Sequence, residues 1–371
     1  MSSSTPLLTV DELSVVFRRR GAEATRAVDG VSFTLEEGRV TGLVGESGCG
    51  KSVTSLALMG LLPDRGVTVG GSAALRLPDG DVDLLSLSQR RLRDLRGSQL
   101  AMIFQDPLSS LNPVVPIGRQ VTEILRRHRG LGGERARKEA ADLLYRVGIP
   151  DPTRRLREYP HQLSGGMRQR ALIAMAVACR PRLMIADEPT TALDVTIQAQ
   201  ILELLRDLVT EEGTALLMIT HDLGVVAGLC DDINVLYAGR AVERAPRSEL
   251  FADPTHPYTV GLLGSIPRLD APRGDPLTPV RGSVNDNIAW SDGCAFAPRC
   301  DHYTMDCLQG APALVEAAGG GAHTHRCVNP GADAEREPEE AAGAETGPEE
   351  APAPETGAER TAAVDNEEGR A

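Results

Sequence analysis

The sequence has no apolar run long enough to cross a bilayer. Its longest, "ALIAMAVAC" (Ala171 to Cys179), is far shorter than the roughly 20 residues that a membrane-spanning helix needs. The N-terminal "MSSSTPLLTVDEL" has no basic segment followed by an apolar one, so it does not read as a signal peptide. We therefore expect a soluble, cytosolic protein, in which thiols stay reduced and disulfides are rare. Any membrane role must come through partner subunits.

Basic residues are not in excess, and the formal net charge is −13. The segment 331–371 carries 13 acidic and 3 basic side chains, a net charge of −10, which leaves −3 for the first 330 residues. This segment is rich in Ala, Glu, Pro and Gly and has no aromatic residue, so it buries too little apolar surface to offset the entropy of ordering. We expect a disordered acidic tail. The lack of a basic excess in the rest of the chain argues against a nucleic-acid partner.

A glycine-rich stretch lies between a predicted strand and a predicted helix near the N-terminus. "LLTVDELSVVF" and "VSFTLEEGRVTGLVG" are rich in β-branched residues and read as strands, whereas "KSVTSLALMGLL" has a helical pattern. Between them, "GESGCGKS" matches G-x-x-x-x-G-K-[ST], whose glycines let backbone N–H groups converge on phosphate oxygens. Lys51 would reach the β- and γ-phosphates, and the Ser52 hydroxyl would ligate Mg²⁺. The nucleotide-binding residues expected here are Gly45, Glu46, Ser47, Gly48, Cys49, Gly50, Lys51, Ser52 and Val53.

A second stretch, "LMIADEP", predicts a buried strand that ends in two carboxylates. Asp187, at the carboxyl end of that strand, is placed to hold the shell of a Mg²⁺ ion. Glu188 is placed to orient or deprotonate an attacking water. Alone, the pair could be an ordinary strand end with two acidic residues. Together with the phosphate-binding stretch it indicates nucleotide hydrolysis.

A third stretch, "LSGGMRQR" (Leu163 to Arg170), resembles the signature sequence of the ATP-binding subunits of ABC transporters. In that family the signature serine and glycines, here Ser164, Gly165 and Gly166, contact the γ-phosphate of an ATP held by the other subunit, at the positive end of a helix. The resemblance assigns the remaining elements in chain order: Phe17 stacks on adenine, Gln105 is the Q-loop glutamine and a Mg²⁺ contact, Asp194 belongs to the D-loop, and His221 is the switch histidine that contacts the γ-phosphate.

Further strings resemble one branch of this family, the dipeptide/oligopeptide importers. They are "MIFQDPLSSLNPV", "YPHQLSGGMRQRALIAMA" and "ADPTHPYTVGLL", the last of which, with "GCAFAPRC", is similar to the C-terminal extension of those subunits. Importers of nickel and other small solutes share the branch and remain the alternative cargo. A soluble ABC ATPase of DNA repair or translation is the rival from another class. Such proteins usually carry two ATP units or a long coiled-coil insert, and this sequence shows neither.

The resemblance also implies partners and a mechanism. Two ATP-binding units would pack head to tail and enclose two ATP molecules, with Glu188, His221, Gln105 and Lys51 acting on one of them. The other unit is expected to be a related subunit rather than a second copy. Two membrane-spanning permease subunits and an extracytoplasmic substrate-binding protein would complete the importer. The chain would then sit peripherally on the cytoplasmic face of the cell membrane.

Four cysteines, Cys294, Cys300, Cys307 and Cys327, stand close together near the C-terminus. Their spacing, C-x5-C-x6-C-x19-C, has neither the C-x2-4-C pairs typical of structural zinc nor a familiar ferredoxin pattern. Four thiolates could still bind [4Fe–4S] or Zn²⁺, with His302, His323 or His325 as substitute zinc ligands; disulfides, or thiols that bind no metal, are also possible. Subunits of the resembled branch carry matching cysteines and have been associated with an iron–sulfur cluster. The resemblance therefore favours [4Fe–4S], with Zn²⁺ as the alternative.

The sequence as a whole predicts an α/β fold, namely a P-loop NTPase core of the ABC type with a helical insertion. We expect an ATP-binding domain at 1–250, with its helical subdomain at about 88–175. The segment 251–330 would be a small extension carrying the four cysteines, too proline-rich and poor in apolar residues to form its own core. The disordered acidic tail would follow at 331–371.

Overall fold

The computed structural model describes residues 5–18, 21, 23–191, 193–265, 280–282, 293–318 and 320–330. All of them belong to one compact unit, Met1–Ala332. The predicted acidic tail lies outside the described residues.

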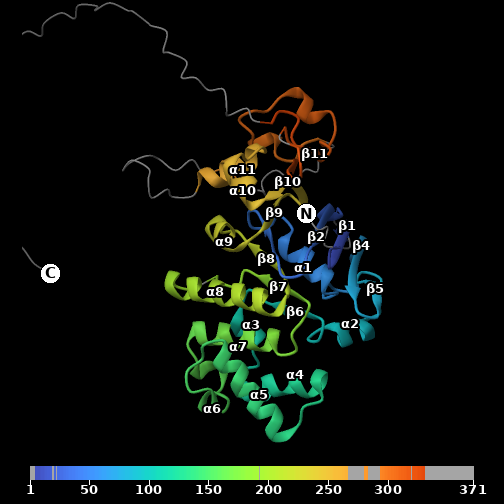
Figure 1. Cartoon of the computed structure of the whole chain (residues 1–371). Coiled ribbons are helices and arrows are strands. Elements are labelled where there is room, and N and C mark those ends of the chain that lie inside the picture. The colour runs from blue at the N-terminus through green and yellow to red at the C-terminus, as the bar shows by residue number, and fades with distance from the viewer. Residues whose placement is uncertain are drawn as a thin grey trace, which may run out of the picture. The chain divides into compact units, whose positions relative to one another are not determined.

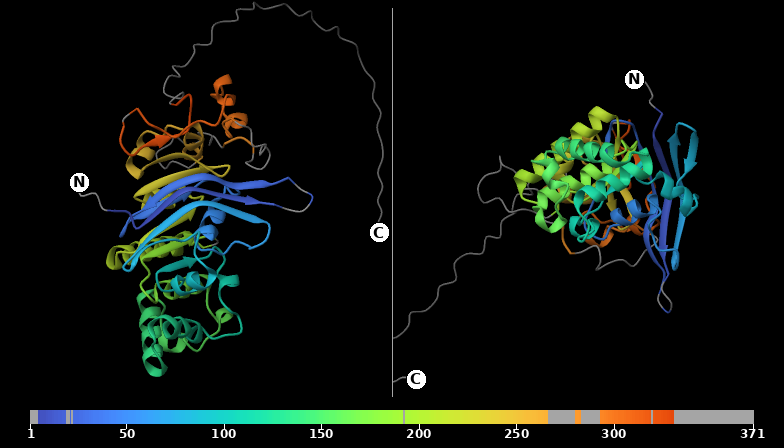
Figure 2. Two further views of the ribbon diagram at one scale, coloured as in Figure 1. Left: turned by 90° about the vertical axis from the view of Figure 1, so that its right-hand side faces the viewer. Right: turned by 90° about the horizontal axis from the view of Figure 1, so that it is seen from below.

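Two sheets form the centre of this unit. The first is antiparallel with the order β2-β1-β4-β5, and the second is mixed with the order β11-β12-β10-β9-β3-β8-β7-β6. The first sheet comprises β1 (Leu8–Phe17), β2 (Thr25–Leu35), β4 (Val67–Leu77) and β5 (Gly80–Asp83). The second comprises β3 (Val40–Val44), β6 (Leu100–Ile103), β7 (Leu183–Asp187), β8 (Ala215–Thr220), β9 (Asp232–Tyr237), β10 (Arg240–Pro246), β11 (Val315–Glu316) and β12 (Thr324–His325). Figure 2 shows the strands of the first sheet as a separate layer beside the rest of the unit.

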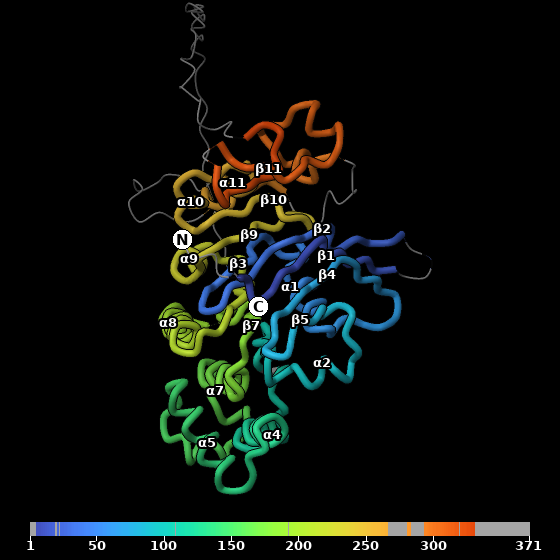
Figure 3. Tube along the Cα trace, turned by 45° about the vertical axis from the view of Figure 1, so that its right-hand side comes forward, coloured from blue at the N-terminus to red at the C-terminus, as the bar shows by residue number. Residues whose placement is uncertain are grey.

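Helices surround the second sheet (Figure 1). They are α1 (Lys51–Leu58), α2 (Gln89–Leu95), α3 (Pro107–Ser110), α4 (Ile117–Arg129), α5 (Gly133–Arg146), α6 (Pro152–Arg155), α7 (Gly165–Val177), α8 (Val195–Glu212), α9 (Leu223–Leu229), α10 (Arg247–Ala252) and α11 (Pro257–Gly264). Short 3₁₀ turns lie at Pro160–Gln162, Ala297–Arg299 and Met305–Leu308. Helices α4 to α6 gather beyond α7 at one end of the unit, and α10, α11 and β11 lie at the other (Figures 1 and 3).

The burial pattern of the strands explains the layers. In β3, β7 and β8 every residue is buried, as expected for parallel strands covered on both faces. One apolar cluster joins the first sheet to the second, for example through Leu13, Phe33 and Leu217. The other joins the opposite face of the second sheet to the helices. The second sheet thus lies between two apolar cores and contributes residues to both.

The structure refines the sequence-based strands in two places. "VSFTLEEGRVTGLVG" contains two strands, because the chain turns through Glu36 to Arg39, where Gly38 adopts a φ of 68°. The two strands even join different sheets. The stretch predicted as the helical subdomain, about 88–175, contains β6, which pairs in parallel with β7. Its four apolar residues are too few for periodicity to distinguish a strand from a helix.

The C-terminal region, residues 251–330, packs into the main core through its described residues. Tyr258 and Phe296, both buried, belong to the apolar cluster that also contains Leu144, Ala186 and Tyr237. The rings of Tyr237 and Phe296 meet edge to face with centroids 5.2 Å apart. Strand β12 adds to the second sheet by pairing with β10. These contacts join the described part of the region to the central sheet and its core.

We predict that Phe296→Ala lowers the free energy of unfolding of the full chain by about 3–5 kcal/mol, since a buried aromatic ring would leave a cavity. Chemical denaturation followed by far-UV circular dichroism measures this loss. Tyr303→Ala, which removes a ring with 42% of its surface exposed, is the matched control and should cost far less. Equal effects of the two substitutions would contradict a shared core.

Candidate functional site

The loop between β3 and α1 has the backbone that its glycines allow. Gly45, Gly48 and Gly50 adopt φ values of 148°, 86° and 105°, which other residues rarely adopt. A Cβ on Gly45 would lie 2.2 Å from the carbonyl oxygen of Leu236, and one on Gly50 would lie 2.6 Å from that of Ala27. The loop is thus pressed against neighbouring backbone on both sides. The predicted phosphate loop lies between a strand and a helix, as its sequence indicated.

Lys51 lies at the start of α1 and is 5% exposed. Its ammonium donates to the carbonyl oxygens of Gly45 at 2.7 Å and Glu46 at 2.9 Å, so it lies under the loop. Cys49, fully buried, also contacts it, and burial raises the pKa of this thiol. A buried cation inside a ring of backbone groups is the arrangement that favours a polyphosphate.

Asp187 ends β7 and faces the phosphate loop. The Ser52 hydroxyl donates to its Oδ1 at 3.1 Å, which brings together two of the predicted Mg²⁺ contacts. Burial raises the pKa of Asp187, and the neighbouring Glu188 charge adds to this, whereas the hydrogen bond from Ser52 opposes it. A divalent cation there would favour the ionised carboxylate.

Three polar side chains meet on Glu188. Gln105 donates its amide to Oε2 at 2.8 Å, the Thr191 hydroxyl donates to Oε2 at 3.0 Å, and His221 Nδ1 lies 3.0 Å from Oε1. Burial alone would raise the pKa of Glu188, but the hydrogen bonds from His221 and Thr191 outweigh it and hold the pKa below its usual value. Glu188 also has a left-handed backbone, with a φ of 47°. The carboxylate is therefore ionised, oriented and partly open to solvent.

The strand order explains why these residues meet. Parallel pairing joins β3 to β8, β8 to β7 and β7 to β6, so their carboxyl ends share one edge of the sheet. Ligands of such α/β sheets bind at that edge. The sequence missed Thr191, although it stands in the same "ADEPTTALD" string as Glu188. Phe17 lies half-buried at the end of β1, in the first sheet.

The signature residues lie at the start of another helix. Ser164 caps α7 by accepting a hydrogen bond from the Met167 N–H at 3.3 Å, and Asp194 caps α8 by accepting one from Ile197 at 3.0 Å. A Cβ added to Gly165 would have nothing within 4 Å, so the backbone there is open to a ligand. Within the described part of the chain, no hydrogen bond or ion pair joins these signature residues to the phosphate loop.

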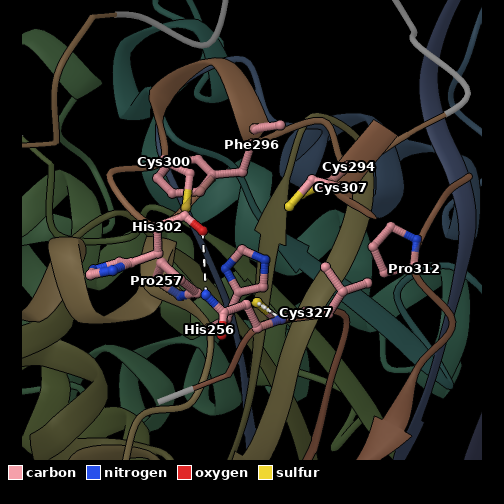
Figure 4. A pocket seen from close by; sticks show the side chains of 12 residues that line it. His256, Pro257, Cys294, Phe296, Cys300, His302, Cys307, Pro312 and Cys327 are labelled. Atoms are coloured by element: carbon pink, nitrogen blue, oxygen red, sulfur yellow. Dashed lines mark hydrogen bonds between the residues drawn. The ribbon is translucent and has the colours of Figure 1, made fainter. Parts of the chain in front are cut away.

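The four C-terminal cysteines lie around one small cavity (Figure 4). All are free thiols, and the cavity measures about 10 Å³, roughly room for one water. Burial raises the pKa of Cys294, Cys300 and Cys327, and for each of these thiols the charge of neighbouring cysteines adds to it. His302 and His256 also line the cavity.

Neither of the other two histidines considered as ligands is among the residues that line the cavity. His323 Nε2 lies 2.7 Å from Oε1 of the buried Glu243, and His325 Nδ1 accepts the Cys327 N–H. Among the described residues, no group of three or more His, Cys, Asp or Glu side chains has the arrangement of a metal site. The four cysteines and His302 thus lie around one cavity, but their atoms are not arranged as the ligands of a metal ion. Cys230 is buried, and burial raises its pKa to about 12, in keeping with an inert core thiol.

Over the part of the chain that the structure describes, no helix combines the length and the apolar character needed to cross a membrane.

Comparison with known proteins matches both regions of the chain. The family model of the ABC transporter matches residues 28–191, and that of the oligopeptide/dipeptide transporter C-terminal region matches residues 242–307. The oligopeptide transport ATP-binding protein OppD of Salmonella typhimurium is 48% identical over 83% of this chain and 90% of its own length. The dipeptide transport ATP-binding protein DppD of Bacillus subtilis is 50% identical over 81% of this chain and 88% of its own length.

The fold is similar to solved structures as well. The ATP-binding cassette MJ0796, determined as a dimer in a post-hydrolysis state with ADP and phosphate, matches with a TM-score of 0.57 and 27% sequence identity. The match covers 65% of this chain and 98% of that one. The predicted P-loop fold of the ABC type is thereby confirmed.

We predict that Gly45→Ala abolishes tight binding of phosphate groups and destabilises the chain by roughly 1–3 kcal/mol, because the new Cβ overlaps backbone and the residue keeps a positive φ. Calorimetric titration with Mg·ATP and thermal denaturation measure the two effects. Gly228→Ala is the matched control: it lies in α9, where an added Cβ would have nothing within 4 Å. There we expect unchanged binding and a gain of up to about 1 kcal/mol. Wild-type binding by Gly45→Ala would contradict the assignment of the phosphate loop.

Proposed function

Because this chain belongs to the ATP-binding subunits of ABC transporters, we propose that it powers the import of di- and oligopeptides by hydrolysing ATP. The proposal of ATP hydrolysis rests on one arrangement at the edge of the sheet. There Lys51 binds the backbone of the phosphate loop, Ser52 binds Asp187, and Gln105 binds Glu188. The proposed cargo is supported by the C-terminal region, whose family model takes its description from oligopeptide and dipeptide transporters, and by relatives bearing the same names.

In this proposal the residues of the phosphate loop bind the polyphosphate of ATP. The backbone N–H groups between Gly45 and Val53 hold the phosphate oxygens, and Lys51 neutralises the β- and γ-phosphates. Ser52, Asp187 and Gln105 hold Mg²⁺, the ion that supplies charge neutralisation when bound. Phe17 provides a ring for the adenine.

Glu188 acts on the water that attacks the γ-phosphate. Its contacts with Gln105, Thr191 and His221 fix the carboxylate, which can then orient the water and accept its proton. His221 and Gln105 lie within hydrogen-bond distance of the carboxylate, so they can align it and contact the γ-phosphate. Positioning and electrostatic stabilisation are the main contributions to phosphoryl transfer, and these side chains supply both.

A second ATP-binding unit completes each site. Ser164, Gly165 and Gly166 lie at the start of α7, apart from the phosphate loop of the same chain, which suits contact with ATP on a partner unit. Asp194 caps the neighbouring α8 and would lie at the same interface. A head-to-tail arrangement of two units follows, and the solved relative MJ0796 is itself described as a dimer. We expect the other unit to be a related subunit.

The remaining partners of an importer follow from its task. Two membrane-spanning permease subunits would form the path of the peptide across the membrane, and an extracytoplasmic binding protein would deliver the peptide to them. This chain would dock on the permeases from the cytoplasmic face. The loop after Gln105 is the expected contact, because movement of Gln105 toward the nucleotide would pull on it.

The four C-terminal cysteines are proposed to hold [4Fe–4S], with Zn²⁺ as the alternative. The support for this proposal is the type of ligand: four cysteine thiols lie around one cavity, and thiolates are the ligands that iron–sulfur clusters and many zinc sites use. The present side-chain positions do not form a coordination shell, so the cysteines would have to rearrange around a four-iron core. We derive no step of ATP hydrolysis from this group.

We predict that Glu188→Gln lowers ATP turnover by about 10²–10⁴-fold while ATP still binds, since the substitution removes the base but keeps the shape. Phosphate release and retained nucleotide are measured on the transporter purified with its membrane subunits. Glu203→Gln, the same change at an exposed position of α8, is the control and should hydrolyse normally. Wild-type-like hydrolysis by Glu188→Gln would refute the role of Glu188.

The same preparation, placed in vesicles together with its extracytoplasmic substrate-binding protein, tests the cargo. We expect ATP-dependent uptake of a labelled tripeptide, lost in Glu188→Gln. ATP-dependent uptake of nickel without peptide uptake would contradict peptide import.

Anaerobic purification tests the metal proposal. We expect about four irons per chain and a broad absorption band near 400 nm, both lost when Cys300 is replaced by Ser. Cys179→Ser, a thiol outside the cavity, is the control and should retain both. A preparation without iron and without the band would overturn the cluster, and stoichiometric zinc would establish the alternative.

A further inference from the structure

The C-terminal region reaches into the phosphate loop through Arg299. This arginine stands between Cys294 and Cys300 in the sequence, yet its guanidinium binds the carboxylate of Glu46, the second residue of the loop. The pair is bidentate, with Nη1 to Oε2 at 2.6 Å and Nη2 to Oε1 at 2.9 Å. Two parallel charge-assisted bonds fix both distance and orientation.

Tyr258 holds the same residue by its backbone. The Glu46 N–H donates to the Tyr258 hydroxyl at 2.9 Å. Tyr258 is fully buried at the start of α11, and its ring packs on Tyr237 with centroids 4.7 Å apart. Two residues of the C-terminal region therefore bind Glu46 at two different groups.

The Arg299–Glu46 pair differs from an ordinary surface ion pair. The Arg299 side chain is 2% exposed, and it also donates to the carbonyl oxygens of Arg281 and Gly282. The guanidinium lies 5.6 Å from the ring centre of Tyr237, within range of a cation–π contact. A buried and fully partnered guanidinium is a rigid anchor, because any movement would leave it uncompensated.

Glu46, held in this way, also contacts the residues of the nucleotide site. Its carbonyl oxygen accepts from Lys51 at 2.9 Å and from the Cys49 N–H at 3.3 Å. The side chain and N–H of Glu46 are thus held from the C-terminal region, while its carbonyl orients Lys51. The glycines on either side leave the loop free to adopt other shapes without such an anchor.

We propose that Arg299 and Tyr258 are positioning residues that act through Glu46 to shape the phosphate loop for ATP, so that the C-terminal region sets the affinity for nucleotide. The proposal rests on the nucleotide site described above. A loop held in its binding shape loses less conformational freedom when the ligand arrives, which raises affinity without a new contact.

The same anchor connects the nucleotide site to the cysteine cavity. Arg299 directly precedes Cys300, and Phe296, whose ring centre lies 6.0 Å from the guanidinium, lines the cavity. A change in the packing of these cysteines therefore moves the groups that hold Glu46. Coupling between two sites is reciprocal, so nucleotide must also alter the cavity.

Binding of a non-hydrolysable ATP analogue with Mg²⁺ to the full-length chain tests the proposal by calorimetry. Arg299→Met should raise the Kd about tenfold, and Arg299→Lys, which keeps the charge without the planar fork, should have an intermediate effect. Tyr258→Phe and Glu46→Gln, which preserve packing, should also weaken binding. In the assembled transporter the KM for ATP should rise while kcat at saturating ATP is retained.

Thermodynamic coupling separates this role from general damage. The double variant Glu46→Gln/Arg299→Met should bind no more weakly than the weaker single variant, because both changes break one interaction. Arg137→Met is the matched control: its side chain, on α5, is 67% exposed and pairs with the exposed Glu134, so its Kd should match the wild type.

Two results would overturn the positioning role of Arg299, and a third would refute the nucleotide site on which that role depends. Wild-type affinity in folded Arg299→Met, or additive losses in the double variant, would overturn the proposal. If Arg299→Met does not fold, wild-type affinity in both Tyr258→Phe and Glu46→Gln would overturn it equally. Failure of the wild-type chain to bind the analogue would instead refute the nucleotide site itself.

The effect of bound nucleotide on the cysteine cavity is measured by the reactivity of a cysteine thiol. In protein purified without metal, saturating analogue should change the rate at which Cys300 reacts with a disulfide reagent at least about twofold in the wild type and leave it unchanged in Arg299→Met. Equal nucleotide effects in both proteins would overturn the coupling.

Discussion

Parallel pairing of β3, β8 and β7 is the constraint on which the rest of this structure depends. It brings the ends of three strands to one edge, and from these ends come the phosphate loop, the Asp187–Glu188 pair and His221. Each strand is buried along its whole length, so their register is fixed by both cores. The polar side chains at this edge are therefore held within hydrogen-bond distance of one another, at about 3 Å.

The C-terminal region depends on the same sheet. Strand β12 extends it, and Phe296 and Tyr258 complete one of its cores. The described part of this region is thereby fixed against the ATP-binding domain, close to the phosphate loop. This explains how a region without a predicted catalytic residue comes to bind Glu46. Among the described residues, the domain and its C-terminal region thus share one sheet and one apolar core.

Local sequence patterns predicted most of the site, because its chemistry is encoded in short strings. The loop around Lys51 and the strand ending at Asp187 follow from residue type and order alone. Contacts between distant parts of the chain could not be predicted from local patterns. Glu46 and Arg299, for example, are 253 residues apart, and no periodicity links them. The hairpin β4–β5, which pairs with β1 from a separate stretch, was missed for the same reason. The four cysteines were found by spacing, but their packing around one cavity depends on the tertiary fold.

Hydrogen exchange of the full-length chain with and without Mg·ATP tests most directly whether the nucleotide binds at the edge formed by these strands. There, backbone N–H groups of the loop would hold its phosphates. Mg·ATP should then slow exchange of the amides from Glu46 to Val53, while amides of α4 and α5 exchange as before. Unchanged exchange in that loop at saturating Mg·ATP, or protection confined to other elements, would contradict this placement of the nucleotide.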